Sequence, residues 1–200
     1  MLALTLHPTE LRKPNHLVRA KLRWSPVDGG KLLLFYEVQG SERIVWPAAQ
    51  AGATENSGSL TGRRVDELWK ATCFECFLGP FAERQYIEWN FSVTGDWAAY
   101  SFKDYRDGMT QASVSAPHIH LSKKSDPFSS DRFFLEVETE VPDELRASDS
   151  DVADFSRFEA SLTAVIIEAN EEKPFYWAVE HRREKPDFHA RESFTRMVER

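Results

Sequence analysis

The chain has 200 residues, of which 28% are charged and 42% hydrophobic, a composition typical of a folded globular protein rather than a disordered one. Its formal net charge is −7 and its Lys and Arg residues are scattered, which argues against a surface that binds nucleic acid. No apolar run approaches the about 18 residues that a membrane span needs, so no membrane partner is expected. Residues 1–16 lack the basic start and unbroken apolar stretch of a secretory signal, which predicts a cytoplasmic protein whose two cysteines stay reduced.

Alternation of apolar and polar side chains predicts strands along most of the chain. In residues 17–24 the apolar Val18, Ala20 and Leu22 alternate with basic residues, the period of a strand with one face in water. A Pro-Val-Asp-Gly-Gly turn signal follows, and it predicts a hairpin with residues 31–38. Further strands are predicted at residues 71–78, 85–92, 97–102, 113–122, 132–141, 161–169 and 175–180.

The segments between these strands are rich in Gly, Pro, Asp and Ser. Residues 48–62 form the longest irregular loop, and residues 141–160 are expected to hold a short helix. The sequence shows neither a βαβ alternation nor a Gly-rich phosphate loop. Many short strands at even spacing predict an all-β fold, an antiparallel β-sandwich with short helical insertions. Because one core can serve a chain of this length, we expect a single domain over residues 1–200.

The strand at residues 71–78 contains a Cys-x-x-Cys pair. Side chains alternate across a strand, so Cys73, Glu75 and Phe77 share one face while Cys76 points to the other. Three strand steps separate the two cysteine Cα atoms by about 10 Å, beyond the roughly 7 Å limit for a disulfide. We therefore expect two structural thiols, with no redox or metal function for the pair.

The segment at residues 85–92 is the expected hairpin partner of this strand. Tyr86, Glu88 and Asn90 share one of its faces, so the pairing can place Glu75 beside Glu88 or Asn90. Neighbouring carboxylates on adjacent strands are compatible with general acid–base catalysis on a glycoside. The sequence offers no recognisable set of nucleophile, base and orienting group, so no catalytic residue is predicted. A solvated surface strip and the polar floor of a ligand site both remain possible interpretations.

Three stretches resemble a known group of proteins: LWKATCFECFL at residues 68–78, YIEWNFSVTGDWAAYSFKDYRDGM at residues 86–109, and residues 161–194. Together they resemble the DOMON-like β-sandwich ligand-binding domains, which are related to family nine carbohydrate-binding modules. Some relatives in that group are associated with UDP-N-acetylenolpyruvoylglucosamine reductase. The resemblance implies a carbohydrate-binding-module-like sandwich of jelly-roll type and a small-molecule ligand such as a sugar.

The same resemblance implies the residues of a ligand site. In the sugar-binding relatives a tryptophan stands six residues before a strand glutamate, as Trp69 and Glu75 do here. The adjacent strand supplies an Arg-x-Asn pair, and here Asn90 matches while Glu88 takes the place of the arginine. The remaining expected ligand-binding residues are Arg106, as a source of the missing guanidinium, and Trp177, as a second aromatic wall.

The chemistry of these residue types supports the same idea. A pyranose presents an apolar face that stacks on an aromatic ring, and its hydroxyls bind a carboxylate or an amide. Trp69 and Trp177 could equally be core or loop-anchoring tryptophans. Trp97, Tyr100, Phe102 and Tyr105 are expected to pack the sandwich.

Other candidates carry less information. His118 and His120 point the same way from a strand and could share a metal, but no third ligand is visible. Met109 and the six histidines allow, in principle, the haem ligation of other DOMON domains, although nothing selects one pair. Residues 185–189, KPDFH, are expected to pin the end of the chain. No metal and no cofactor is predicted.

We therefore expect a non-catalytic module that binds a saccharide or a glycosylated metabolite. One alternative is a glycoside-acting enzyme that uses Glu75 and Glu88, and another is a protein-interaction module that uses its sheet face. The sequence does not determine the oligomeric state.

Overall fold

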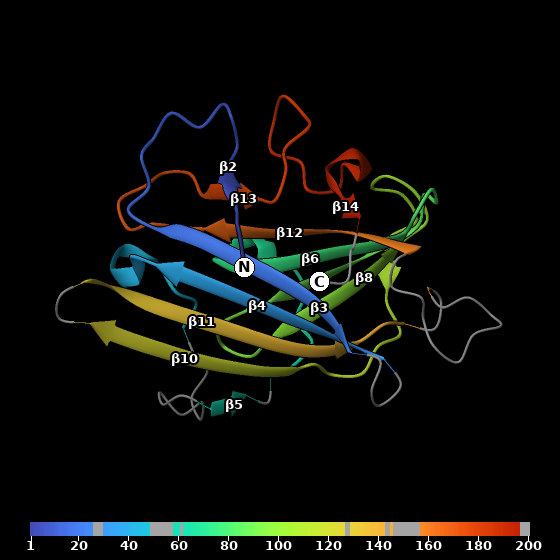
Figure 1. Cartoon of the computed structure of the whole chain (residues 1–200), viewed down its shortest axis with the longest axis horizontal. Helices are drawn as coiled ribbons and strands as arrows, with labels where there is room; N and C mark the ends of the chain where they lie inside the picture. The colour runs from blue at the N-terminus through green and yellow to red at the C-terminus, as the bar shows by residue number, and fades with distance from the viewer. Residues whose placement is uncertain are drawn as a thin grey trace.

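The protein is described from a computed structural model that covers residues 1–25, 30–48, 58–60, 62–126, 129–142, 145 and 157–196. Two antiparallel sheets form a sandwich, which confirms the predicted all-β class. Figure 1 shows β3, β4, β11 and β10 side by side, with the second sheet overlapping them in this view. Among the described residues, no helix has the length and apolar character needed to cross a membrane.

Within the described residues, the first sheet has six strands. In spatial order they are β1 (Leu2–Ala3), β3 (Leu17–Ser25), β4 (Lys31–Gln39), β11 (Ser129–Glu140), β10 (His118–Asp126) and β5 (Gly58–Leu60). The predicted hairpin is present, because β3 and β4 pair from Leu17 opposite Gln39 to Ser25 opposite Lys31. Its turn, residues 26–29, lies outside the described part of the chain.

The second sheet has eight strands in the part of the chain that the structure describes. In spatial order they are β2 (Thr5–Leu6), β13 (Phe175–Ala178), β12 (Phe158–Ile166), β6 (Cys73–Pro80), β7 (Tyr86–Phe91), β8 (Trp97–Phe102) and β9 (Thr110–Gln111), with β14 (Thr195–Arg196) beside β12. The helical insertions in the described residues are the 3₁₀ turns η2 (Ser41–Arg43), η3 (Leu68–Lys70) and η6 (Arg191–Ser193). Figure 1 shows β2 beside β13 and β14 beside β12, so strands from near both ends of the chain belong to this sheet.

All nine predicted strands exist, with shifted ends. The strand predicted from residue 113 begins at His118, directly after Pro117, which has no backbone N–H to donate to a ladder. The strand predicted from residue 161 begins earlier, at Phe158. Part of the predicted loop at 48–62 is strand β5, and most of the predicted helical stretch at 141–160 lies outside the described residues.

The main hydrophobic core fills the space between the sheets. Val18, Ala20 and Leu34 point inward from the six-stranded sheet, and Phe74 and Trp89 from the eight-stranded one. These inward positions follow the period of two along each strand. The core therefore fixes which side chains of β6 and β7 face away from it.

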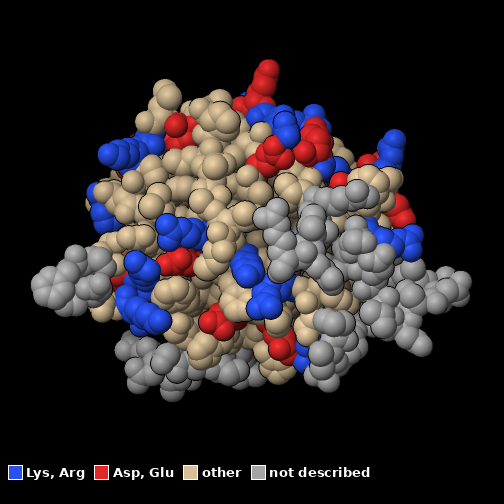
Figure 2. Space-filling model, in the orientation of Figure 1, with Lys and Arg blue, Asp and Glu red and all other residues tan. Residues whose placement is uncertain are grey.

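The outward face of the six-stranded sheet carries charges of both signs. Arg19 and Arg132 both lie near Glu37, at 3.5 and 3.4 Å, and Lys31 contacts Glu138 at 2.5 Å. Figure 2 shows basic and acidic side chains interspersed over the face in view. Such a mixed surface provides no strong field of one sign on this face.

The outward face of the eight-stranded sheet is covered rather than solvated. A second hydrophobic cluster lies on it, which we call the outer aromatic cluster: Phe77, Tyr86, Ala98, Tyr100, Phe102 and Phe194, with Leu68, Trp69 and Phe188 packed against it. Residues 185–194, here named the C-terminal segment, contribute Phe188 and Phe194 to this cluster. As a result, every residue of β7 is buried although its side chains alternate between two faces.

Candidate functional site

A pocket opens between the eight-stranded sheet and the C-terminal segment. Its volume is about 460 Å³, within the range of small-molecule sites. Its floor is formed by side chains of four neighbouring strands: Glu75, Phe77, Glu88, Phe102 and Val165. Its walls come from the surrounding turns and β13: Trp69, Arg106, Met109, Tyr176, Pro186, Phe188 and His189.

Glu75 stands in the middle of the floor. On β6 it lies opposite Asn90 of β7 on one side and Thr163 of β12 on the other. Its side chain is buried, and its Oε2 accepts a hydrogen bond of 2.9 Å from the hydroxyl of Thr163. Burial raises the pKa of the Glu75 carboxyl and the nearby Glu88 raises it further, against the smaller effects of Thr163 and Arg106.

Glu88 is the second carboxylate of the floor. It is also buried, and its Oε1 accepts a hydrogen bond of 2.7 Å from the side-chain amide of Asn90. Burial raises the pKa of the Glu88 carboxyl, while the Asn90 amide and the Arg106 guanidinium act in the opposite direction. The two carboxylates are diagonal neighbours on adjacent strands, since Glu75 pairs with Asn90 and Phe77 with Glu88.

Asn90 supports the floor from beneath. It has no exposed surface, and its Oδ1 lies 3.6 Å from the Cys73 Sγ, a weak thiol contact. Because its amide N–H is used by Glu88, Asn90 orients a carboxylate and does not itself line the pocket. Cys73 thus belongs to the outer face, whereas Cys76 lies in the main core, as the strand parity predicts.

His189 forms the wall beside Glu88. The backbone N–H of Arg106 donates to the Tyr86 hydroxyl oxygen at 3.2 Å, and the Tyr86 Oη lies 2.8 Å from His189 Nδ1. This network assigns the Tyr86 proton to Nδ1 and leaves the Nε2 proton of a neutral imidazole directed at Glu88 Oε2, 3.6 Å away. Burial, helped by Arg106, lowers the pKa of His189 to about 4.

Arg106 occupies the rim. Its backbone is left-handed, with φ of 51°, an uncommon conformation for a residue with a side chain. Its guanidinium pairs with Asp187 of the C-terminal segment at 3.0 Å, and the Tyr105 hydroxyl donates to the other oxygen of Asp187 at 2.6 Å. The rim cation is therefore already neutralised by a carboxylate.

Trp69 forms the wall opposite the C-terminal segment. It lies on η3, before β6 begins, so its side chain approaches the pocket from a turn and not from the strand. Its indole packs edge-on against the ring of Tyr100, with centroids 5.8 Å apart. The ring is partly exposed, which leaves an aromatic surface available to a ligand.

Trp177 does not lie at the pocket, which corrects the expectation of a second tryptophan wall. It is buried in the main core, and its indole N–H donates to His16 Nε2 at 2.9 Å. His16 Nδ1 lies 2.6 Å from Glu168 Oε1 and completes a buried chain of hydrogen bonds. Trp177 points inward like Phe175, so its neighbour Tyr176 is the residue of β13 that reaches the pocket.

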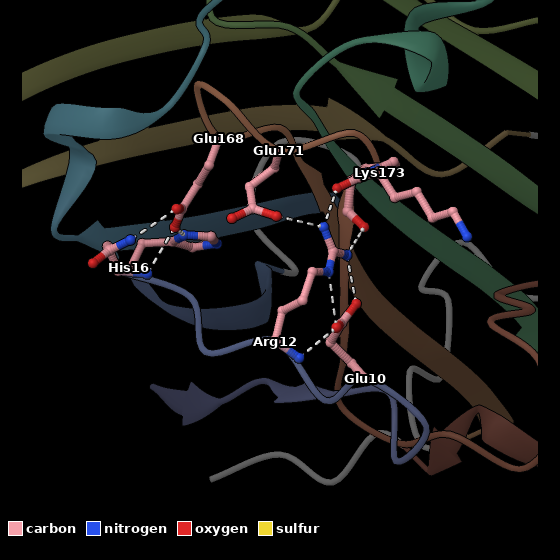
Figure 3. A network of polar contacts seen from close by, with 8 residues as sticks. Glu10, Arg12, His16, Glu168, Glu171 and Lys173 are labelled. Atoms are coloured by element: carbon pink, nitrogen blue, oxygen red, sulfur yellow. Dashed lines mark hydrogen bonds and ion pairs between the residues drawn. The ribbon is translucent and has the colours of Figure 1, made fainter.

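Figure 3 shows the His16 and Glu168 part of this chain beside a second polar network that holds the N-terminal segment. Glu168 accepts hydrogen bonds from the backbone and the side chain of Asn15 in addition to His16. Arg12 contacts Glu10, Glu171 and the carbonyl of Lys173. These contacts hold the segment before β3 against the β12–β13 connection, and none of the residues that make them lines the pocket.

The structure thus brings Trp69, Glu75, Glu88 and Arg106 together at one pocket, with Asn90 behind them. It corrects the view of the two glutamates as a possible solvated strip, because Glu75 and Glu88 are 3% and 5% exposed. It also places Phe102 in the pocket floor, beyond the packing role expected for it.

Sequence reasoning missed the C-terminal segment as a wall of the site. Phe188 and His189 lie within the KPDFH stretch, which was expected only to pin the chain end. A usable signal was present: Phe77 and Phe102 are large apolar residues at outward positions, and such residues require a cover.

The described residues contain no group of three His, Cys, Asp or Glu side chains that could hold a metal ion. His118 and His120 are both exposed on the same side of β10. Met109 lies at the pocket wall and is 48% exposed.

The fold can be compared with those of known proteins. A candidate carbohydrate-binding protein from Bacteroides uniformis has a similar structure, with a TM-score of 0.58 at 16% sequence identity, over 97% of this chain and 82% of that chain. At this identity the likeness concerns the fold. No protein-family model and no curated protein sequence matches the chain.

Proposed function

We propose that this chain is a single DOMON-like domain that binds a small ligand without turning it over, and that the ligand is a saccharide or a glycosylated metabolite. The observation that carries the proposal is the pocket itself. It combines aromatic walls with two buried carboxylates that converge on one floor. An apolar cavity with a few fixed polar groups is the usual form of a small-molecule site.

The arrangement suits a ring that has one apolar face and several hydroxyls. Trp69 and Phe188 offer aromatic surface on different walls, and Glu75 and Glu88 offer carboxylate oxygens on the floor. Thr163 and Asn90 hold these carboxylates in place. Binding therefore requires little rearrangement of the floor, which keeps the entropic cost of binding low.

The likeness in fold to a candidate carbohydrate-binding protein supports the proposal. So does the position of Trp69, Glu75 and Asn90 around one site, as the resemblance to family nine modules implies.

The proposal is tested by calorimetric titration with monosaccharides, disaccharides and sugar nucleotides. We expect one of these classes to bind and Trp69→Ala to weaken it by roughly 1–3 kcal/mol, the usual cost of truncating an aromatic anchor. Trp46→Ala is the control, because Trp46 packs on Phe133 in the main core region, away from the pocket. Binding that Trp69→Ala leaves unchanged would place the ligand elsewhere.

A glycoside-acting enzyme is the second candidate, and the raised pKa values of Glu75 and Glu88 favour it. Paired carboxyls whose environments shift their pKa values are typical of acid–base catalysis. The test is incubation with a panel of aryl glycosides and sugar nucleotides. Turnover that disappears in both Glu75→Gln and Glu88→Gln would establish the enzyme and reject the non-catalytic module.

A further inference from the structure

The two carboxylates of the floor have no cationic partner in direct contact among the described residues. Glu75 Oε2 accepts from Thr163, and its Oε1 has no hydrogen-bond partner in that part of the chain. Glu88 Oε1 accepts from Asn90, and the nearest base to its Oε2 is His189 Nε2, 3.6 Å away. Two carboxyls are thus more than nine-tenths buried and only partly satisfied, and their ionised forms are costly without compensation.

The groups around them do not supply this compensation. Arg106 is half exposed at the rim and already paired with Asp187. His189 is neutral, since burial keeps its pKa near 4. The Tyr36 hydroxyl donates to the backbone carbonyl of Glu75, and Cys73 lies on the same strand as Glu75. Both side chains stay uncharged, because burial raises the pKa of each. Among the residues that the structure describes, the floor therefore has no charged group in direct contact that would stabilise its carboxyls in the ionised form.

Aromatic rings surround these carboxyls. Phe77 and Phe102 lie beside them in the floor, Trp69 and Phe188 form part of the walls, and the face of an aromatic ring attracts a cation. A neutral sugar could stack on these rings but would bring no charge to the carboxylates. An ammonium group has three donors, enough to engage both Glu75 and Glu88.

We propose that the pocket selects ligands that carry a protonated amine on a ring, with the ammonium held between Glu75 and Glu88 and the ring between the aromatic walls. An amino sugar is one such ligand. This inference rests on the proposed binding function of the same pocket and narrows its ligand class.

Binding should be coupled to proton release. The free pocket retains protons on its carboxyls at neutral pH because burial disfavours their ionised forms. An ammonium group favours the ionised forms and displaces these protons. Affinity for an amine should therefore increase as pH rises, until the amine itself loses its proton.

The test compares glucosamine, glucose and N-acetylglucosamine, which differ in one substituent of the ring, with cyclohexylamine as an amine without hydroxyls. Calorimetric titrations in buffers of different ionisation enthalpy measure both affinity and protons released. We expect glucosamine to bind at least about tenfold more tightly than glucose, which corresponds to about 1.4 kcal/mol. We also expect proton release near neutral pH, and cyclohexylamine to bind more tightly at about pH 8 than at about pH 5.5.

Glu75→Gln and Glu88→Gln should each remove the preference for the amine, and thermal unfolding checks that both variants are folded. The matched control is Glu136→Gln, since Glu136 is exposed on β11 of the other sheet. Glucose that binds as tightly as glucosamine overturns the amine inference and leaves the saccharide function intact. Cyclohexylamine that binds while these sugars, the disaccharides and the sugar nucleotides all fail supports the inference and rejects the saccharide function. If none of the compounds binds, both proposals fail.

Discussion

Tyr86 and His189 are 103 positions apart in the chain, and their side chains meet in a hydrogen bond of 2.8 Å between Oη and Nδ1. The bond joins β7, which carries the floor of the pocket, to the C-terminal segment, which forms its wall. The Tyr86 ring also stacks on Phe102, with centroids 4.8 Å apart and planes 7° apart. One residue therefore sets both the position of the wall and the tautomer of His189.

Replacing Tyr86 by Phe keeps the ring and removes this bond. We expect a loss of roughly 1–3 kcal/mol in the free energy of unfolding, because buried polar partners are left unpaired. The His189 pKa should rise, since Nδ1 becomes free to accept a proton. Denaturant titration and NMR titration of the histidine ring measure the two effects. Tyr176→Phe is the control, and an unchanged His189 titration in Tyr86→Phe would contradict the assigned network.

The raised pKa of Glu75 predicts that part of the stability is lost as pH rises. Its pKa is raised in the folded protein from the ordinary value of 4.5, so the folded state binds the proton more tightly than the unfolded state. Stability from this group is complete below about pH 4.5 and is lost as pH rises through neutrality. Glu75→Gln should therefore stabilise the protein near pH 8, by on the order of 1–3 kcal/mol, and change little near pH 4.5. Denaturant unfolding at both pH values checks this, with Glu136→Gln as control; an equal loss of stability at both would refute it.

Substitution of Trp177 is expected to lower stability without changing ligand affinity. Trp177→Phe removes the indole N–H and leaves the buried Nε2 of His16 without its donor, at a cost of about 1–3 kcal/mol. Ligand affinity should stay unchanged, because Trp177 faces the main core. Parallel unfolding and binding measurements separate the two readouts. Normal stability together with weakened binding in Trp177→Phe would show that Trp177 contributes to the ligand site.

Gly79 is the point where β6 passes beneath Arg191. A Cβ there would lie 2.3 Å from Arg191 Nη1 and 2.7 Å from the carbonyl oxygen of Gln85. Arg191 donates to the carbonyl of Pro80 at 2.7 Å and so anchors the C-terminal segment. Gly79→Ala should cost about 1–3 kcal/mol in stability through overpacking and should also weaken ligand binding.

The double variant Gly79→Ala with Arg191→Ala identifies the cause of this loss. If the guanidinium is the obstacle, the double variant should be more stable than the sum of the two single effects. Strict additivity would assign the loss to the Gln85 backbone instead.

The two thiols should be inert in the folded protein. Cys73 and Cys76 are buried, and burial raises both pKa values. A thiol reagent should modify neither residue under native conditions and both after denaturation without a reductant. Modification of Cys73 before Cys76 under native conditions would show that the outer face opens, since Cys73 lies on the pocket side.

The strands were predictable because the alternation of side chains encodes them. This alternation correctly predicts that Glu75 and Cys73 point to one face of the sheet and Cys76 to the other. The short strands β1, β2, β5, β9 and β14 have two or three residues, too few to show a period.

Strand parity could have excluded Trp177 from the site, because Trp177 shares the inward face of its strand with Phe175, but the resemblance to sugar-binding modules favoured Trp177 as a site residue. The burial of Glu75 and Glu88 depends on a segment about 100 residues later in the chain, and no local pattern reports such a contact.

Strands from near both ends of the chain lie in one sheet, which has a consequence for how the molecule folds. β2 pairs with β13 across about 170 positions, and β14 lies beside β12. Contacts of such long range are slow to form, because a large loop must close before they contribute. During synthesis the sheets can assemble only in part until residues 175–196 have emerged from the ribosome. The pocket is then the last region to be completed, and we expect a nascent chain that lacks this segment to leave Phe77, Tyr86 and Phe102 uncovered and so to be prone to aggregation.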